Sequence, residues 1–198
     1  MAISDSDISN TLSAYLASHP QDAAQLSEPM RLLQRGTNFA SRRTFPLHVT
    51  VGALLVRGDE ILLVEHRAYG ILLQPGGHLE PHDTSLIGAA VRELTEETGL
   101  DPHEISAVSH TPVYIEHGTV PARSEKVEPE HSHLDIGYCF SATAQADIGN
   151  IQASEVTSAG WYPLSVAECL VGSRIGRALT VRSIVSQLSS DIPDNRVQ

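Results

Sequence analysis

Cysteine is scarce in this sequence, since only Cys139 and Cys169 occur among its 198 residues. Two cysteines cannot form a disulfide framework, and Cys139 lies within an apolar, strand-like run. We therefore expect both to be buried thiols without a disulfide, which suits the reducing cytoplasm. The sequence thus favours a cytoplasmic location.

Basic residues are also few. Lys and Arg total 13 against 24 Asp and Glu, which gives a formal net charge of −11. An acidic surface disfavours non-specific binding to nucleic acid or to an anionic membrane, so we expect neither as a partner. A small phosphorylated substrate stays compatible with this charge, provided that metal ions screen the carboxylates.

Long apolar runs are missing as well. No run approaches the roughly 18 residues that a membrane-spanning helix needs, and residues 1–10 lack the basic and apolar regions of a signal peptide. Hydrophobic residues nevertheless make up 41% of the chain, enough for a sizeable core. The length suits one domain with an appendage.

The first 35 residues show apolar positions at helical spacing, interrupted at His19-Pro20 and stopped at Gly36. This pattern predicts a pair of amphipathic helices, which could cap a cleft or form a homodimer interface. The predicted organisation is an N-terminal helical extension over residues 1–44, a main domain over 45–190 and a flexible tail over 191–198.

After Phe45 the sequence alternates between strand and helix patterns, with a hairpin turn at 57–59. The predicted strands cover 48–56, 60–66, 71–74, 105–116, 133–143 and a short run ending near 161–162. The predicted helices cover 84–98, a segment after Pro163 and 174–189. Residues 117–132 are expected to form a long polar loop. This mixture predicts the α+β class, as an α/β sandwich.

The central helix crowds three glutamates together. At 100° per residue, Glu96 and Glu97 lie within about 60° of Glu93, so the three carboxylates share one face. A neighbouring apolar face is expected to be buried, and it consists of Ile87, Ala90, Val91 and Leu94. Like charges at this spacing repel, and Arg92 can offset only one of them. A divalent cation such as Mg²⁺ would relieve the repulsion, whereas the alternative is a solvated acidic surface.

Residues 76–100, GGHLEPHDTSLIGAAVRELTEETGL, resemble the signature of the Nudix hydrolases. That signature reads Gly, five residues, Glu, seven residues, and then Arg-Glu-apolar-x-Glu-Glu-x-Gly-apolar. Asp83 departs from it by replacing the first Glu, and one extra residue precedes Arg92, which weakens a role for Asp83. The resemblance extends less specifically over residues 46–165. The matching positions are Gly77, Arg92, Glu93, Leu94, Glu96, Glu97, Gly99 and Leu100.

The resemblance implies a Nudix-type α/β/α sandwich with a mixed β-sheet. It also implies hydrolysis of the diphosphate linkage in a small nucleoside diphosphate joined to another moiety. The implied cofactor is Mg²⁺ or Mn²⁺, which would neutralise the transferring oxygens and activate water. Arg92 would orient a glutamate of the site. The implied metal ligands are Glu93, Glu96, Glu97 and the Gly77 carbonyl.

The general base is open between two groups of acids. One group lies in the motif, as Glu93 and Glu97. The other group lies in or beside the polar loop, and consists of Glu116, Glu125, Glu128 and Glu130.

Four further residues are candidates for substrate binding. Arg67 precedes the third strand and His78 follows the double glycine, so each could contact a phosphate or remain a solvent-exposed loop residue. In the strand 133–143 the polar residues alternate with apolar ones, and we expect His133 and Asp135 to line the substrate cleft. The run His131-x-His133-x-Asp135 could instead hold zinc, but a half-exposed strand is favoured over that reading.

Two other functions compete with hydrolysis. An isomerase of isopentenyl diphosphate would need a cysteine near the cleft, and the apolar setting of Cys139 disfavours it. A non-catalytic nucleotide-sensing module of the Nudix-like kind usually has a basic appendage, but residues 1–35 contain only Arg31 and Arg35 as basic residues. ADP-ribose, nucleoside triphosphates, dinucleoside polyphosphates and nucleotide sugars all remain open as substrates.

Overall fold

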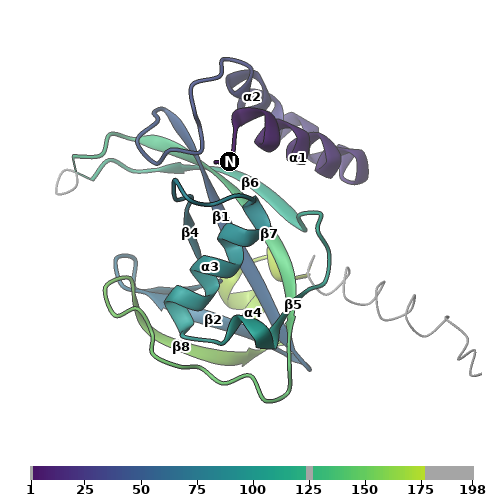
Figure 1. The fold of residues 1–198 in the computed structure, drawn as a ribbon, viewed down its shortest axis with the longest axis vertical. Coiled ribbons are helices and arrows are strands. Elements are labelled where there is room, and N and C mark those ends of the chain that lie inside the picture. Colours follow the sequence, from purple (N-terminus) through teal and green to yellow (C-terminus); the bar gives the residue numbers. More distant parts are fainter. Residues whose placement is uncertain (1, 124–126, 177–198) are drawn as a thin grey trace, which may run out of the picture.

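The computed structural model describes residues 2–123 and 127–176. It shows an eight-stranded mixed sheet with helices on both sides, as the α/β/α prediction required (Figure 1). The helices are α1 (Asp5–Ser18), α2 (Ala23–Leu33), α3 (Leu86–Thr98) and α4 (Leu164–Val171), with short 3-10 turns at Pro20–Asp22 and Pro102–Glu104. The strands are β1 (Leu47–Arg57), β2 (Glu60–His66), β3 (Ile71–Leu73), β4 (Gly76–His78), β5 (Ile105–Ala107), β6 (Tyr114–Val120), β7 (His131–Ala142) and β8 (Val156–Pro163).

The predicted hairpin between β1 and β2 is present, but the two strands soon separate. Their antiparallel register covers Val56↔Ile61 and Arg57↔Glu60, and β2 then pairs with β8 and β3. Farther along β1, the short strand β4 takes the place of β2, with Val51 opposite Gly77. The sequence did not predict β4. Its insertion places the double glycine against the centre of the sheet.

Strand β7 runs parallel to β1, in register from Leu47↔Ser132 to Val56↔Ser141. The prediction of a half-exposed strand is wrong here, because β7 lies inside the sheet and most of its side chains on both faces are buried. Its apolar face packs in the larger core, whereas Cys139 belongs to the smaller core on the other side.

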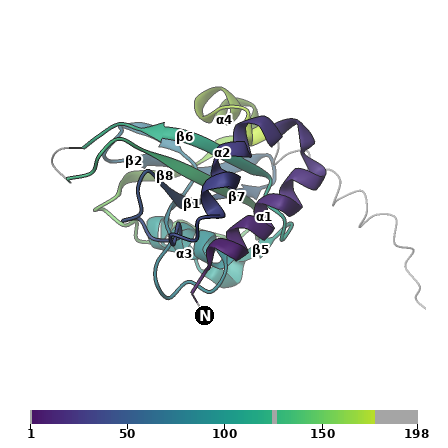
Figure 2. The same ribbon diagram turned by 90° about the horizontal axis from the view of Figure 1, so that it is seen from above.

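Two hydrophobic cores lie on the two sides of the sheet, and Figure 2 shows α3 and α4 on opposite sides of the strands. The larger core joins α1, α2 and α3 to residues such as Val49 and Val51 of β1. The smaller core joins α4 to Leu54 and Val56, which point to the opposite face of β1 from the residues in the larger core. Strand β1 is therefore buried on both faces.

The N-terminal helices form as predicted, and their apolar sides pack on the sheet. Ser4 caps α1 through a reciprocal capping box with Asp7. Tyr15 is fully buried and its hydroxyl donates to Asp22 at 2.5 Å. The Asp5 carboxylate accepts the backbone N–H groups of residues 38 and 39, which ties the helix to the segment that leads into β1. The predicted boundary at residue 44 stays a prediction.

Several sequence-based boundaries were wrong. The single strand expected over 105–116 is two strands, β5 and β6. Most of the expected loop over 117–132 is also strand, since β6 continues to Val120 and an isolated bridge pairs Arg123 with Glu128. Polar residues in this hairpin hid its strand pattern. Cys169 is exposed rather than buried. The expected helix at 174–189 lies mostly, and the tail over 191–198 wholly, outside the described residues.

Within the described part of the chain, no helix is both long and apolar enough to cross a membrane.

Gly137 offers a test of the β6–β7 packing. A Cβ atom there would overlap the ring of Tyr114, its cross-strand partner, whereas one at Gly118 would have no neighbour within 4 Å. We expect Gly137→Ala to lower the free energy of unfolding by about 1–3 kcal/mol, as overpacking does. Urea unfolding followed by Trp161 fluorescence measures this, with Gly118→Ala as the matched control. Equal stability of the two variants would contradict the packing described.

Candidate active site

Helix α3 has well-defined ends that fix the position of its glutamates. The Ser85 hydroxyl accepts the Gly88 N–H at 3.1 Å, and Gly99 ends the helix in the left-handed conformation at φ 68°. Glu93 and Glu97 lie on the buried side of the helix, at 6% and 2% exposure. The expectation of a separate acidic strip beside a buried apolar face is therefore wrong for these two carboxylates. Glu96 alone fits it, with a side chain that is 47% exposed.

The double glycine lets both buried carboxyl groups reach the backbone of β4. A Cβ atom on Gly77 would lie 2.7–2.8 Å from the Glu93 carboxyl atoms, so no other residue leaves room for this approach. The Gly76 N–H donates to Oε2 of Glu97 at 3.0 Å. Gly76 and Gly77 thus form a cradle for the carboxylates of α3.

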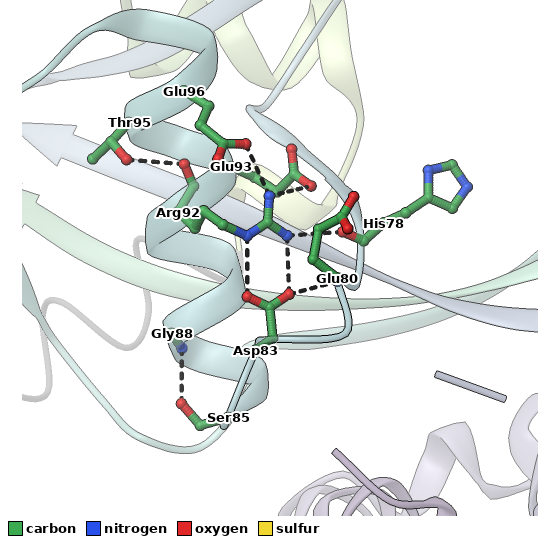
Figure 3. Close-up of polar contacts among 9 residues, drawn as sticks. All are labelled: His78, Glu80, Asp83, Ser85, Gly88, Arg92, Glu93, Thr95 and Glu96. Carbon is green, nitrogen blue, oxygen red and sulfur yellow. Dashed lines mark hydrogen bonds and ion pairs between the residues drawn. The ribbon is translucent and has the colours of Figure 1, made fainter. Parts of the chain in front are cut away.

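Arg92 is the centre of a network of ion pairs (Figure 3). Its guanidinium donates to both carboxylate oxygens of Asp83 at 3.0 Å, to Glu93 at 3.0 Å and to Glu96 at 2.9 Å. It also donates to the His78 carbonyl at 2.9 Å, which links α3 to β4. The single positive charge of Arg92 is thus shared among three carboxylates, so it cannot neutralise them all. Asp83, which stands where the motif has its first Glu, holds Arg92 in place and so has a structural role.

Burial leaves the two inner glutamates short of positive charge. Burial raises the pKa of Glu97 to about 8, although the hydrogen bond from the Gly76 N–H opposes this shift. It also raises the pKa of Glu93 to about 7, although the charge of Arg92 opposes that shift. A divalent cation that accepts oxygen ligands would restore both groups to the ionised form. The donor set of Glu93, Glu97 and the glycine cradle therefore fits Mg²⁺ or Mn²⁺, and Glu96 lies at its edge.

A cleft of about 480 Å³ begins at this cradle and crosses the sheet, which is a volume typical of small-ligand sites. Among the motif residues, Gly76, Gly77 and Glu97 line it, whereas Glu93, Glu96 and Arg92 do not. Neither N-terminal helix contributes a lining residue. All four predicted substrate-binding residues line it, namely Arg67, His78, His133 and Asp135.

The loop acids have different positions. Glu128 lines the cleft, whereas Glu116 pairs with Arg174 at 3.1 Å and Glu130 is not among the lining residues. Glu125 lies outside the described residues. The sequence analysis missed Glu155, which lines the cleft close enough to Glu93 and Glu97 to raise the pKa of both. No local pattern around Glu155 could have revealed this position.

A buried polar network, also missed, forms the floor of the cleft. Asp135 accepts hydrogen bonds from the Thr50 hydroxyl at 3.0 Å and from the Tyr114 hydroxyl at 2.9 Å, and Gln74 donates to Tyr114 at 2.9 Å. Burial raises the pKa of Asp135. Because its oxygens are engaged here, Asp135 does not join the histidines as the suggested His-x-His-x-Asp zinc site required. The alternation of polar and apolar residues predicted which side of the sheet Asp135 faces, but not the residues to which it bonds.

Neither cysteine is placed for chemistry in the cleft. Cys139 is buried in the smaller core and Cys169 is exposed on α4, and neither is a lining residue. The isomerase alternative thus lacks the cysteine that it would need.

Comparison with known proteins agrees with this geometry. The sequence model of the NUDIX domain matches residues 46–178, which is about two thirds of the chain. The chain belongs to the Nudix family. A crystal structure titled as a hydrolase of the NUDIX family from Clostridium perfringens has a TM-score of 0.51 at 22% identity, and the match covers 71% of this chain and 97% of that one. It supports the fold.

Two curated proteins match part of the chain. A Lactococcus lactis protein named "Probable DHNTP pyrophosphohydrolase" is 29% identical, over 50% of this chain and 57% of its own length. The mouse "Peroxisomal coenzyme A diphosphatase NUDT7" is 34% identical, over 40% of this chain and 36% of its own length. The chain therefore spans less than two thirds of the length of either relative, and both names describe cleavage of diphosphate compounds.

The raised pKa of Glu97 predicts how stability depends on pH. The folded state holds this proton more tightly than the unfolded state, so the stabilisation that protonation gives is lost as pH rises through about 8. The histidines with lowered pKa act mainly below about pH 6.5, where the unfolded chain gains protons, so they do not mask the effect between about pH 7 and 8. Glu93, whose pKa is raised to about 7, adds a smaller loss of stability of the same sign in this window.

In that window and without metal, we expect the free energy of unfolding to fall by up to about 1.4 kcal/mol per pH unit. Urea titrations in EDTA measure the slope, and Glu97→Gln should reduce it to the smaller contribution of Glu93. The same slope in wild type and variant would show that Glu97 titrates normally.

Proposed function

We propose that this Nudix protein is a divalent-metal-dependent pyrophosphohydrolase, which cleaves the diphosphate linkage of a nucleoside diphosphate joined to another moiety. The observation that carries the proposal is the burial of Glu93 and Glu97 against Gly76 and Gly77, at the mouth of a nucleotide-sized cleft. Such a site gains most from a doubly charged cation bound to oxygen ligands.

Glu93, Glu97 and the Gly77 carbonyl would hold Mg²⁺ or Mn²⁺, with Glu96 as an outer ligand. The bound cation would supply charge neutralisation on the phosphoryl oxygens and lower the pKa of an attacking water. Arg92 fixes the rotamer of Glu93 and clamps α3 to β4 through the His78 carbonyl. Its role is therefore to position the carboxylates.

The general base must face the cleft to reach a water molecule. Glu93 does not line the cleft and its Oε1 accepts a hydrogen bond from Arg92, which makes it a weaker candidate than the sequence suggested. Glu97 and Glu155 both line the cleft beside the cradle. We assign the base to this pair of acids.

The cleft also concentrates positive charge in an acidic protein. Four of the chain's 13 basic residues line it, namely Arg42, Arg67, Arg123 and Arg174. Arg123 stacks on Tyr69 at 4.6 Å from the ring centroid, which leaves an aromatic face and a guanidinium together at the rim. These residues suit a substrate with phosphate groups at one end and a flat ring at the other.

The complete glutamate set favours catalysis over the non-catalytic sensor alternative. A regulatory module would not need carboxylates that are held at a cost of desolvation. A small-molecule substrate in the cytoplasm remains part of the proposal, as does the absence of nucleic-acid and membrane partners.

Turnover of a panel of nucleotide diphosphates tests the proposal. We expect phosphate or nucleotide release in Mg²⁺ from at least one class among ADP-ribose, nucleoside triphosphates, dinucleoside polyphosphates, nucleotide sugars and coenzyme A. Glu97→Gln should lower kcat by about 100-fold or more, since either a lost base or a lost metal ligand costs at least this much. Glu28→Gln, on the exposed side of α2, should leave kcat unchanged.

Two results would overturn the proposal. One is the absence of turnover of every class by the wild-type protein with Mg²⁺ or Mn²⁺. The other is a Glu97→Gln variant that folds and keeps full activity, which circular dichroism and kinetics together would reveal.

A further inference from the structure

Four histidines from three different strands meet at one end of the cleft. His48 lies on β1, His78 on β4, and His131 and His133 on β7. The parallel register sets His48 beside His133, and the antiparallel register sets Thr50 beside His78, so His48 and His78 lie two positions apart along the same side of the sheet. Figure 3 shows the His78 ring pointing away from Arg92 and the motif carboxylates.

Three of these rings are close enough to share one ion. The ligand nitrogens of His48, His78 and His133 all lie within 4.8 Å of one another. Two nitrogens bound to one Zn²⁺ lie at most about 4 Å apart, because each Zn–N bond is about 2.0–2.1 Å. The Nε2 atoms of His48 and His78 are already 3.2 Å apart. Small rotations of the rings would close the site.

A backbone carbonyl orients one of the three rings, that of His48, in the way that is usual for a metal ligand, and another orients the neighbouring His131. Nδ1 of His48 lies 3.3 Å from the Thr44 carbonyl, so this nitrogen can donate and Nε2 can present its lone pair to the cluster. Ligating histidines usually have such an outer partner, which fixes the tautomer. Nδ1 of His131 lies 2.7 Å from the Pro129 carbonyl, and its Nε2 lies 3.2 Å from Nε2 of His133.

Two arginines and one carboxylate act on the cluster, since Arg123 and Arg42 both lie near His133 while Glu128 acts on His48. Arg42 lies near the rings, but it pairs with Glu128 at 3.7 Å. In the described part of the chain, no carboxylate belongs to the cluster. The donor set is thus nitrogen only, unlike the oxygen set of the glycine cradle.

We propose that His48, His78 and His133 form a binding site for Zn²⁺, or for another transition ion that prefers imidazole. Three histidines with an open fourth position are the ligand set of zinc sites that bind a water or a substrate oxygen. Because His78 and His133 line the cleft, a molecule bound in the cleft could supply the fourth ligand. Mg²⁺ disfavours nitrogen ligands, so the two sites select different ions.

This inference stands apart from the proposed hydrolysis, because it is tested by metal binding alone. The full-length, tag-free chain is stripped with a chelator and dialysed against Zn²⁺ with Mg²⁺ in large excess. Zinc per chain is then measured by elemental analysis. We expect one zinc per chain in the wild type.

Variants assign the ligands. Loss of a residue that only hydrogen-bonds to a metal ligand weakens metal binding by roughly 10–100-fold. We expect His48→Ala and His133→Ala, which each remove a ligand, to weaken zinc binding by more than this. His110→Ala removes an exposed histidine elsewhere and should bind zinc like the wild type. Glu97→Gln should also retain its zinc, because its carboxylate belongs to the other site.

A measurement on the wild type covers the case in which a histidine variant unfolds. Histidine side-chain ¹H–¹⁵N spectra recorded with and without Zn²⁺ should show three imidazoles that become metal-bound through nitrogen. Absence of zinc uptake by the wild type overturns the proposal. So does zinc that is lost in Glu97→Gln but kept in His48→Ala and His133→Ala, and so do histidine spectra that zinc leaves unchanged.

Discussion

The approach of two carboxyl groups to a double glycine constrains the rest of this structure. Glu93 can reach β4 only because Gly77 lacks a Cβ atom, and Glu97 accepts its hydrogen bond from Gly76 only if α3 lies directly on that strand. This approach excludes water from both groups and raises their pKa. The position of α3, the Arg92 clamp and the mouth of the cleft all follow from it.

The local sequence predicted the parts of the site that lie within one segment. The caps of α3, the motif and the β1–β2 turn each depend on neighbouring residues, so their patterns were visible. The direction of Glu93 and Glu97 was not, because helical periodicity locates a face but does not say what covers it. Tertiary packing decided that the acidic positions of α3 face inward.

Residues supplied by distant segments were the hardest to predict. Thr50 joined the cleft, and His48 the histidine cluster, only through the parallel pairing of β1 with β7. Glu155 reached the cleft through a loop without any regular pattern. The same holds for charge. An acidic total hid a cleft whose rim is rich in arginine, since composition reports a sum and a binding site depends on how charge is distributed.

The β1–β7 pairing has a consequence for how the protein folds. It joins residues as far apart as Thr50 and Asp135, which are 85 positions apart in the chain. Contacts of such separation raise the contact order and slow folding, because a long loop must close before they form. The cleft floor therefore assembles only when the last central strand docks. A nascent chain whose β7 has not yet left the ribosome therefore lacks the strand that completes its binding surface.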